Sequence, residues 1–206
     1  MIISQYNKNA INLAITQLQQ QKAIALPTDT IYGLAVDASS IKAVETLYEF
    51  KKRDNQKPIA IFVQNLEMAK EIFYFNQLAE KIANLYMPGK ITIILNVKEN
   101  NFSLAKNLNY NNNKIGFRYV NSFFMAKLLE IYQKPLAVTS ANISGFEVAK
   151  SAHDIAKIFN LELIIDNEET CNNLASTVVE ITKDSYKILR QGEVKINDCI
   201  FNNIAI

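Results

Sequence analysis

Helical and strand patterns alternate along almost the whole chain, and this alternation restricts the fold more than any other feature of the sequence. Apolar residues recur at helical spacing over 9–20, and the apolar run 23–26 that follows is typical of a buried strand, which Pro27 ends. A second helix is expected to begin after Ser39 or Ser40 as its N-cap.

The same periodicities predict the remaining elements. Helices are expected near 66–74, 77–86, 122–132 and 152–159. Strands are expected near 59–63, 91–97, 114–119, 135–139, 162–165, 177–181 and 186–189, and the Asn-rich stretch 98–113 is the one long loop. The sequence therefore predicts a single α/β domain over residues 1–206, built around a mixed sheet with flanking helices.

Composition limits the function classes. The chain has 206 residues, of which 49% are hydrophobic and 20% charged, which is typical of a globular protein with one full-sized core, although two lobes remain an alternative. A formal net charge of +2 means that any attraction for nucleic acid must come from a local patch. Cys171 and Cys199 are far apart, and neither a signal peptide nor a membrane-length apolar run is present. We therefore expect a cytoplasmic protein without membrane contact.

The single histidine, His153, excludes a histidine-rich metal site. A histidine-dependent catalytic triad would have to use it. Ser151 and Asp154 form a capping box, which places His153 in the first turn of a helix. We interpret it as a solvated residue, with catalysis as the alternative.

Phosphate-binding motifs of the common nucleotide folds are absent from the sequence. The pair Gly89-Lys90 resembles the end of a P-loop, but Ile91 stands where a hydroxyl residue should follow the lysine. No glycine lies five positions before Gly89 either. The patterns of Rossmann folds and of serine hydrolases are also missing.

Three polar loops follow predicted elements, and each offers a different chemistry. They are P-T-D-T-I-Y-G at 27–33, K-K-R-D-N-Q-K-P at 51–58 and T-S-A-N-I-S-G at 139–145. In α/β sheets, ligands usually sit beyond strand ends, where loops converge. Hydroxyl and amide donors beside cations would suit an anion such as a nucleotide triphosphate. The alternatives are plain turns, with Gly145 at a positive-φ corner, and a solvated run of charge.

The loops occur in a fixed order with four further motifs. These are P-G-x-x-T at 88–92, Arg118 at a strand end, S-T-V-V at 176–179 and L-R-Q-G at 189–192. Over residues 20–192 the set resembles the YrdC-like threonylcarbamoyl-AMP synthases in their short bacterial form. The resemblance implies a YrdC-like fold, with a twisted open mixed sheet and a concave, positively charged site.

This resemblance also implies a reaction. L-threonine, bicarbonate or carbon dioxide, and ATP would give threonylcarbamoyl-AMP and pyrophosphate, with Mg²⁺ on the phosphates and no metal ligand expected from the protein. Downstream threonylcarbamoyl-transfer proteins would then modify the adenosine next to the anticodon of tRNA. The chemistry requires positioning and charge stabilisation, because two anions and a triphosphate must meet in one place.

The motif matches imply a role for each site residue. The catalytic set would be Lys51, Arg53, Ser140 and Asn142. ATP would be bound by Arg53, Lys57, Lys114, Ser140, Asn142 and Arg190, and threonine by Thr30, Arg118 and Ser176. Lys51 and Arg53 are expected on an exposed loop, so replacing either by alanine should remove most product formation and leave the fold intact.

Several positions depart from the family pattern. Asp54 follows the arginine where proline is usual, and Phe62 and a residue near Ser122 replace histidines. The stretch 87–90 reads M-P-G-K in place of W-P-G-P. These departures bear on the threonine pocket and leave the choice between threonine and serine open.

Two other function classes remain as alternatives. One is a module of the same fold that binds double-stranded RNA or tRNA without turnover, although base-stacking aromatic residues do not cluster near the cationic loop. The other is a carbamoyl-transfer domain like that of hydrogenase-maturation proteins, whose additional segments do not fit in this length. Turnover of ATP with threonine and bicarbonate separates the enzyme from the RNA module.

Overall fold

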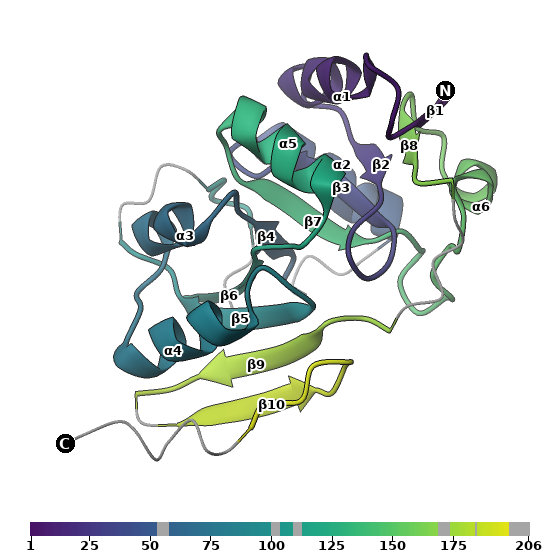
Figure 1. Ribbon diagram of the computed structural model, residues 1–206. Coiled ribbons are helices and arrows are strands. Elements are labelled where there is room, and N and C mark those ends of the chain that lie inside the picture. Colours follow the sequence, from purple (N-terminus) through teal and green to yellow (C-terminus); the bar gives the residue numbers. More distant parts are fainter. Residues whose placement is uncertain (53–57, 100–103, 109–112, 169–173, 184, 198–206) are drawn as a thin grey trace.

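Ten strands form one mixed sheet in the computed structural model, which describes residues 1–52, 58–99, 104–108, 113–168, 174–183 and 185–197. The strand order is β1-β8-β2-β3-β7-β4-β6-β5-β9-β10 (Figure 1). The strands are β1 (Ile2–Ser4), β2 (Ile24–Leu26), β3 (Gly33–Asp37), β4 (Ala60–Phe62), β5 (Ile91–Asn96), β6 (Lys114–Arg118), β7 (Leu136–Ser140), β8 (Ile164–Asp166), β9 (Thr177–Ile181) and β10 (Tyr186–Arg190). Parallel and antiparallel pairs both occur, as the sequence predicted.

Helices flank this sheet, and their starts follow from the sequence. They are α1 (Ala10–Gln19), α2 (Ile41–Lys51), α3 (Leu66–Ile72), α4 (Gln77–Tyr86), α5 (Phe123–Tyr132) and α6 (Ala152–Ile158). All except α1 begin at a Ser or Asn whose side chain accepts a hydrogen bond from the backbone N–H three residues on. The expected N-cap Ser40 is confirmed. Ser151 caps α6 by accepting from the backbone N–H of Asp154, and its hydroxyl donates to the Asp154 carboxylate. His153 is exposed in the first turn of this helix.

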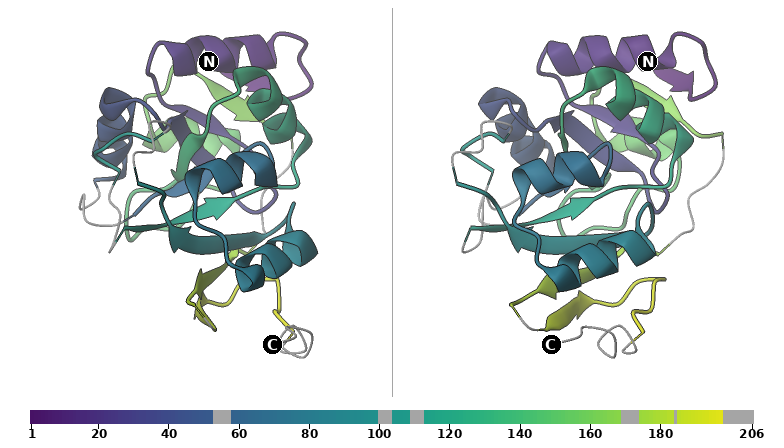
Figure 2. Two further views of the ribbon diagram at one scale, coloured as in Figure 1. Left: turned by 90° about the vertical axis from the view of Figure 1, so that its left-hand side faces the viewer. Right: turned by 60° about the vertical axis from the view of Figure 1, so that its left-hand side comes forward.

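Alternate residues of the strands enter two different hydrophobic clusters, because successive side chains of a strand point to opposite faces. One cluster joins α2, α3, α4 and α6 to one face of the sheet, for example through Ile61, Phe117 and Ala137. The second joins α1 and α5 to the other face, through residues such as Ala35 and Leu136. Both views of Figure 2 show α1 and α5 side by side, at the end of the molecule away from β9 and β10.

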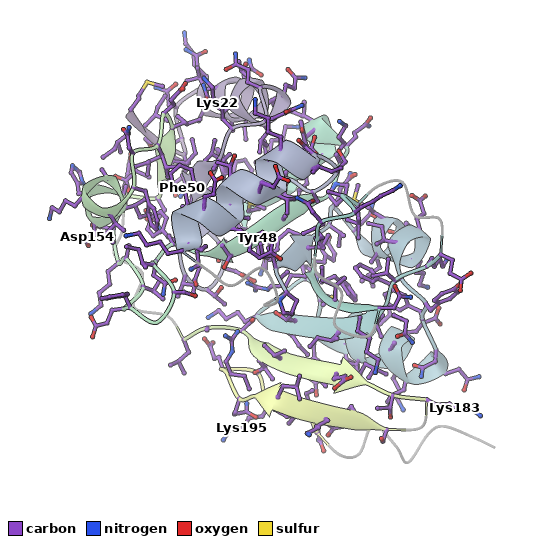
Figure 3. The ribbon with its side chains drawn as sticks, turned by 180° about the vertical axis from the view of Figure 1, so that it is seen from behind. Lys22, Tyr48, Phe50, Asp154, Lys183 and Lys195 are labelled. Atoms are coloured by element: carbon purple, nitrogen blue, oxygen red, sulfur yellow. The ribbon has the colours of Figure 1, made fainter. Side chains whose placement is uncertain are left out.

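The first of these faces is seen from behind in Figure 3, where α2 crosses the strands. Tyr48 of α2 is buried against the sheet, and Phe50 is on the side of the helix towards α6. The rings of Phe50 and Phe159 pack edge to face with centroids 6.0 Å apart. These contacts fix the end of α2, which carries Lys51.

Asp37, the last residue of β3, ties this strand to the end of α5. Its carboxylate accepts hydrogen bonds from the backbone and hydroxyl of Ser39 and from the hydroxyl of Tyr132, and Lys134 lies 3.3 Å away. Burial raises the pKa of Asp37, but the hydrogen bonds from Ser39 and Tyr132 and the charge of Lys134 outweigh it and hold the pKa below its usual value.

Two strands were missed by the sequence analysis. Residues 27–33 were treated as a loop and 34–38 were assigned to no element, but Gly33–Asp37 form β3, which pairs with β2 and β7 near the middle of the sheet. Buried on both faces, β3 shows no alternation of apolar and polar residues, and it begins with a glycine, which strands disfavour. The other missed strand, β1, has three residues and pairs with β8.

Two loops have the local structure that the sequence predicted. Gly145 has φ +88°, which confirms the predicted positive-φ corner after β7. The described part of the stretch 98–113 contains neither helix nor strand before β6. Among the described residues, no helix has the length and apolar character needed to cross a bilayer.

Candidate functional site

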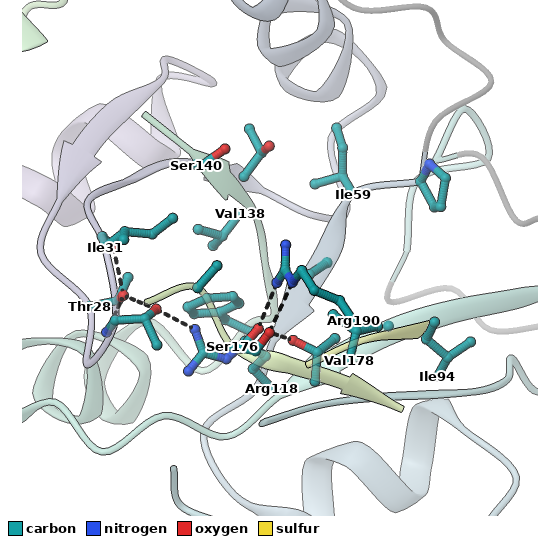
Figure 4. A pocket seen from close by; sticks show the side chains of 18 of the residues that line it. Thr28, Ile31, Ile59, Ile94, Arg118, Val138, Ser140, Ser176, Val178 and Arg190 are labelled. Carbon is teal, nitrogen blue, oxygen red and sulfur yellow. Dashed lines mark hydrogen bonds between the residues drawn. The ribbon is translucent and has the colours of Figure 1, made fainter. Parts of the chain in front are cut away.

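A cavity of about 260 Å³ opens on the face of the sheet that α1 and α5 leave uncovered (Figure 4). Its wall comes from residues two apart on neighbouring strands, namely Ala60 and Phe62, Thr92 and Ile94, Gly116 and Arg118, and Val138 and Ser140. Val178 of β9 and Ser176, directly before that strand, complete it. Side chains two residues apart point to the same face of a strand. The cavity therefore lies across the strands, and not beyond their ends as we expected, with Thr28 and residues 30–32, 58–59 and 175 at its border.

Arg118 is held in a fixed orientation at one side of this cavity. Its guanidinium pairs with the carboxylate of Asp29 at 2.6 Å, and the side chains of both residues are 5% exposed. Other N–H groups donate to the hydroxyl of Thr30 and to the backbone oxygens of Gly89 and Ile91. Burial lowers the pKa of Arg118, and the charge of Asp29 opposes this shift.

Phe62 stands where the resemblance led us to expect a histidine. The guanidinium carbon of Arg118 lies 5.2 Å from the centre of the Phe62 ring, which is a cation–π distance. Phe62 therefore supports Arg118 through its ring face and adds no titratable group to the cavity.

A second arginine, Arg190, reaches the same cavity from the end of β10 (Figure 4). It donates to the backbone oxygen of Ser176 at 3.0 Å and to its hydroxyl at 3.1 Å. The Ser176 hydroxyl is also 2.8 Å from that of Thr92. Burial lowers the pKa of Arg190, whose positive charge in turn lowers that of Arg118. Two cations thus share one wall.

Lys51, Ser140 and Asn142 form a contiguous polar cluster where α2 and β7 end. The Lys51 ammonium donates to the backbone oxygen of Ser140 at 2.7 Å, to its hydroxyl at 3.3 Å and to the side-chain oxygen of Asn142 at 2.6 Å. The expected proximity of Lys51 to Ser140 and Asn142 is therefore confirmed. Its expected place on an exposed loop is wrong, because Lys51 is the last residue of α2 and is 1% exposed.

The other predicted ligand-binding cations divide into two groups. Lys114 does not line the cavity, and instead pairs with Glu180 at 2.7 Å. Arg53 and Lys57 lie outside the described residues, so the positive charge expected of the site stays a prediction. Thr30, Arg118, Ser140, Ser176 and Arg190 all line the cavity together.

Asp29 and Thr92 are among the polar residues at the site that sequence reasoning missed. Asp29 is the carboxylate partner of Arg118, and Thr92 contacts Ser176 inside the cavity. Both belong to motifs that the sequence analysis quoted, P-T-D-T-I-Y-G and P-G-x-x-T. A buried arginine needs an acidic partner, and this requirement could have pointed to Asp29.

No group of three or more His, Cys, Asp or Glu side chains that could hold a metal ion occurs among the described residues. The acceptors near the cavity are hydroxyl groups and the carboxylate of Asp29, which Arg118 occupies. The described wall therefore suits an anionic ligand better than a bare cation.

Comparison with known proteins gives relatives over most of the chain. A threonylcarbamoyl-AMP synthase of Pyrococcus abyssi is 31% identical over 194 residues, which cover 91% of this chain and 55% of the relative. One from the bacterium Photorhabdus laumondii is 32% identical over 161 residues, which cover 77% of this chain and 84% of the relative. The chain thus spans about half the length of the archaeal relative and most of the bacterial one.

A solved structure supports the same relationship. The crystal structure of P. abyssi Sua5 complexed with L-threonine matches with a TM-score of 0.84 at 29% identity, over 93% of this chain and 57% of that one. The family model Sua5/YciO/YrdC, described as "Telomere recombination", matches residues 16–192. The chain therefore belongs to the Sua5/YciO/YrdC family, as its ordered motifs indicated.

Proposed function

We propose that this protein is a threonylcarbamoyl-AMP synthase, which joins L-threonine, bicarbonate and ATP into threonylcarbamoyl-AMP with release of pyrophosphate. Relatives at about 30% identity from archaea and bacteria carry this name. One of the similar structures holds L-threonine. The product would serve the transfer proteins that modify tRNA next to the anticodon.

One observation carries the proposal. Five residues that the sequence assigned separately to ATP and to threonine line a single cavity of about 260 Å³. They come from loops and strands that are far apart in the chain, between Thr30 and Arg190. A site that joins an amino acid to a nucleotide needs both ligand groups in one place, because positioning supplies much of the rate enhancement.

The residues of the wall suggest how the reaction would proceed. Threonine's amine would bond to the carbon of bicarbonate, and the hydroxide of bicarbonate would leave with the amine proton as water, which gives a carbamate. A carbamate oxygen would then displace pyrophosphate from the α-phosphorus of ATP. Arg190, for which no carboxylate partner occurs among the described residues, would bind negative charge that develops there, and Arg118 would orient the substrate carboxylate.

Mg²⁺ would enter as the complex with ATP. Oxygens of the phosphates suit this hard cation, which usually keeps several of its waters. The described residues offer no carboxylate cluster for it. In this proposal the metal neutralises phosphate charge, and the protein contributes the cavity and its hydrogen-bond donors.

Incubation of the purified protein with Mg·ATP, bicarbonate and either L-threonine or L-serine tests the proposal. We expect release of pyrophosphate and a threonylcarbamoyl-AMP peak in the mass spectrum. Arg190→Ala should lower product formation by about 100-fold, as expected for loss of a group that stabilises developing charge. Lys187→Ala, on an exposed position of the same strand, is the matched control and should turn over normally. A folded wild-type protein that releases no pyrophosphate with either amino acid would refute the assignment.

Direct binding of RNA and a cytoplasmic location stay predictions. The exposed lysines of β10 and of the segment after it, Lys187 and Lys195, would be the first to replace in a test of RNA affinity. RNA binding without adenylate formation would favour the alternative of a binding module.

A further inference from the structure

Arg190 lies at the end of β10, where the hydrogen-bond ladder of the sheet is irregular. Among the described residues, β10 is the last strand of the sheet and pairs only with β9. The register shifts between Ile188 and Arg190, which leaves Leu189 without a partner across the ladder. Contacts outside the ladder must therefore contribute to the position of Arg190.

The segment after β10 turns back onto β9 and is bound there by Thr177, the first residue of that strand. The Thr177 hydroxyl accepts a hydrogen bond from the backbone N–H of Gly192 at 3.0 Å and donates one to the backbone oxygen of Val194 at 2.7 Å. A Cβ on Gly192 would lie only 2.5 Å from the backbone nitrogen of Thr177. One hydroxyl thus holds the chain two and four residues after Arg190.

Lys90 binds the same turn from the loop before β5. Its backbone oxygen accepts from the N–H of Thr177 at 3.0 Å, and its ammonium pairs with the carboxylate of Glu193 at 2.6 Å. The backbone oxygens of the residues on either side of Lys90 accept from Arg118. The loop that orients one arginine of the cavity is therefore also attached to the segment that carries the other.

The Thr177 side chain faces away from the cavity. It is fully buried, and Val179 and Ile181, which follow it at alternate positions of β9, belong to the hydrophobic cluster on the other face of the sheet. Ser176 and Val178 line the cavity, because successive side chains of a strand point to opposite faces. The hydroxyl of Thr177 can therefore act on a ligand only through the backbone that it holds.

Fixing this backbone matters because Arg190 reaches the cavity with a long side chain. Its guanidinium donates to the backbone and hydroxyl oxygens of Ser176 (Figure 4). An arginine loses much rotamer freedom when it binds a ligand, and a backbone that is already in place lowers the remaining cost of ordering it. A charged group that stabilises a reaction must also stand in the right place before the reaction begins.

We propose that Thr177 is a positioning residue for Arg190: its hydroxyl, supported by the ion pair of Lys90 and Glu193, holds the segment after β10 so that the Arg190 guanidinium stays at the cavity wall. This inference rests on the proposed function, in which Arg190 binds negative charge of the reacting nucleotide. It gives a role to the threonine of the S-T-V-V motif, which lines no part of the cavity.

Pyrophosphate release by the Thr177→Val variant of the full chain tests the proposal. Valine keeps the shape of the side chain and removes the hydroxyl. We expect kcat/KM for Mg·ATP to fall by about tenfold, less than the loss of about 100-fold expected for Arg190→Ala. Thr177→Ser retains the hydroxyl and should restore turnover to within about threefold of wild type. Thr182→Val is the matched control and should turn over normally, because the Thr182 hydroxyl contacts Ser185 at the opposite end of the hairpin.

A double-mutant cycle with Arg190→Ala shows whether Thr177 acts through Arg190. Adding Thr177→Val to Arg190→Ala should then change kcat/KM by less than about twofold, because the side chain that Thr177 positions is already absent. A merely structural loss would persist in both backgrounds. The affinity of Thr177→Val for L-threonine should stay within about twofold of wild type, since Arg118 keeps its bonds to Thr30 and Asp29.

The ion pair of Lys90 and Glu193 provides a second arm. The two side chains are 28% and 53% exposed, so the pair should contribute little by itself. Lys90→Met should lower kcat/KM by about two- to threefold, and this loss should also disappear in the Arg190→Ala background. Lys90→Glu combined with Glu193→Lys exchanges the charges and should restore turnover. These variants decide the question if Thr177→Val does not fold.

Three results would overturn the inference in a protein whose wild type forms the adenylate. They are wild-type turnover by folded Thr177→Val, an equal loss with and without Arg190, and a fall in threonine affinity as large as the fall in turnover, which would mean that Thr177 acts through Ser176. Where only the Lys90 variants fold, wild-type turnover by Lys90→Met overturns it.

A wild type that forms no adenylate would refute the proposed function separately. The inference is then decided by equilibrium binding of the Mg²⁺ complex of α,β-methylene-ATP. Weaker binding by Thr177→Val than by wild type and Thr177→Ser supports it, and equal affinities of the three proteins overturn it.

Discussion

The buried pair of Asp29 and Arg118 is the feature of the site whose loss should be most visible in stability. One oxygen of Asp29 is 2.6 Å from the Arg118 guanidinium, and the other accepts from the backbone N–H of Asn121 at 3.2 Å. Asp29→Asn keeps the shape of the side chain but replaces one acceptor by a donor. Whichever way the amide turns, it faces either the guanidinium or the N–H of Asn121 with hydrogens.

The size of the effect follows from what remains around Arg118. Breaking a buried ion pair by removing one partner costs about 3–5 kcal/mol, because a charge is left uncompensated. Here the guanidinium keeps its bonds to Thr30, Gly89 and Ile91 and its contact with the ring of Phe62. We therefore expect a smaller loss of about 2–3 kcal/mol, which for a domain of this size lowers Tm by about 5–10 °C.

Urea unfolding at neutral pH and differential scanning calorimetry measure this loss. Glu130→Gln is the matched control, because Glu130 and Lys127 form an exposed pair at 3.1 Å on α5 and should contribute little. The affinity of the folded Asp29→Asn variant for L-threonine should also fall, since Arg118 loses its main anchor. Stability equal to that of wild type would show that Arg118 does not depend on Asp29, and the reasoning would fail.

Two further predictions concern the frame around the site. Asp37 has a lowered pKa, so its bonds contribute stability above the ordinary carboxylate pKa of about 4, and this contribution is lost as the pH falls through the lower folded value. Tyr132→Phe, which removes a hydroxyl that donates to Asp37, should therefore destabilise the protein at pH 7 and progressively less as the pH falls below about 4, as urea unfolding over this range would reveal; a loss that does not change with pH would contradict this coupling. Gly192→Ala should unfold at lower urea than wild type and bind threonine more weakly, because a Cβ there would lie 2.3 Å from the backbone oxygen of Ala175 and 2.7 Å from the carbonyl carbon of Ser176. Gly145→Ala, with φ +88° but open space around it, should cost only about 1 kcal/mol, and a larger effect than that of Gly192→Ala would contradict the argument from close approach.

The elements that the sequence predicted best are those with local signals at both ends. Helix α4 occupies the expected residues 77–86, because Asn76 caps its start and Pro88 follows its end. Strand β3 was missed because its five residues are all buried and show no apolar–polar alternation. They form a strand because they pair with β2 on one side and β7 on the other. Local chemistry thus predicts where a helix begins, whereas a short central strand depends on its neighbours.

The same holds for the candidate site. Local sequence indicates which residues form it, whereas the surrounding fold determines how their side chains are arranged. Thr30, Arg118, Ser140, Ser176 and Arg190 could be assigned from ordered motifs, and all of them line the cavity. Their arrangement across the face of the sheet could not be inferred, because a motif gives the order of residues along the chain and not the direction of their side chains.

Lys51 and Arg190 show that the sequence gives the position of a charged residue but not the partner that its charge has in the fold. A run of lysines and arginine usually lies in solvent, and only the tertiary contact of α2 with the end of β7 supplies the acceptors that allow Lys51 to be buried. Among the described cations of the site, Asp29 neutralises Arg118, and protein oxygens bind Lys51. Among the described residues, Arg190 donates to the backbone and hydroxyl oxygens of Ser176, which are both neutral, and it carries its charge to the cavity wall. The attraction of the described wall for anions should therefore depend mainly on Arg190, while Lys51 and Asp29 determine the shape and polarity that the anion meets.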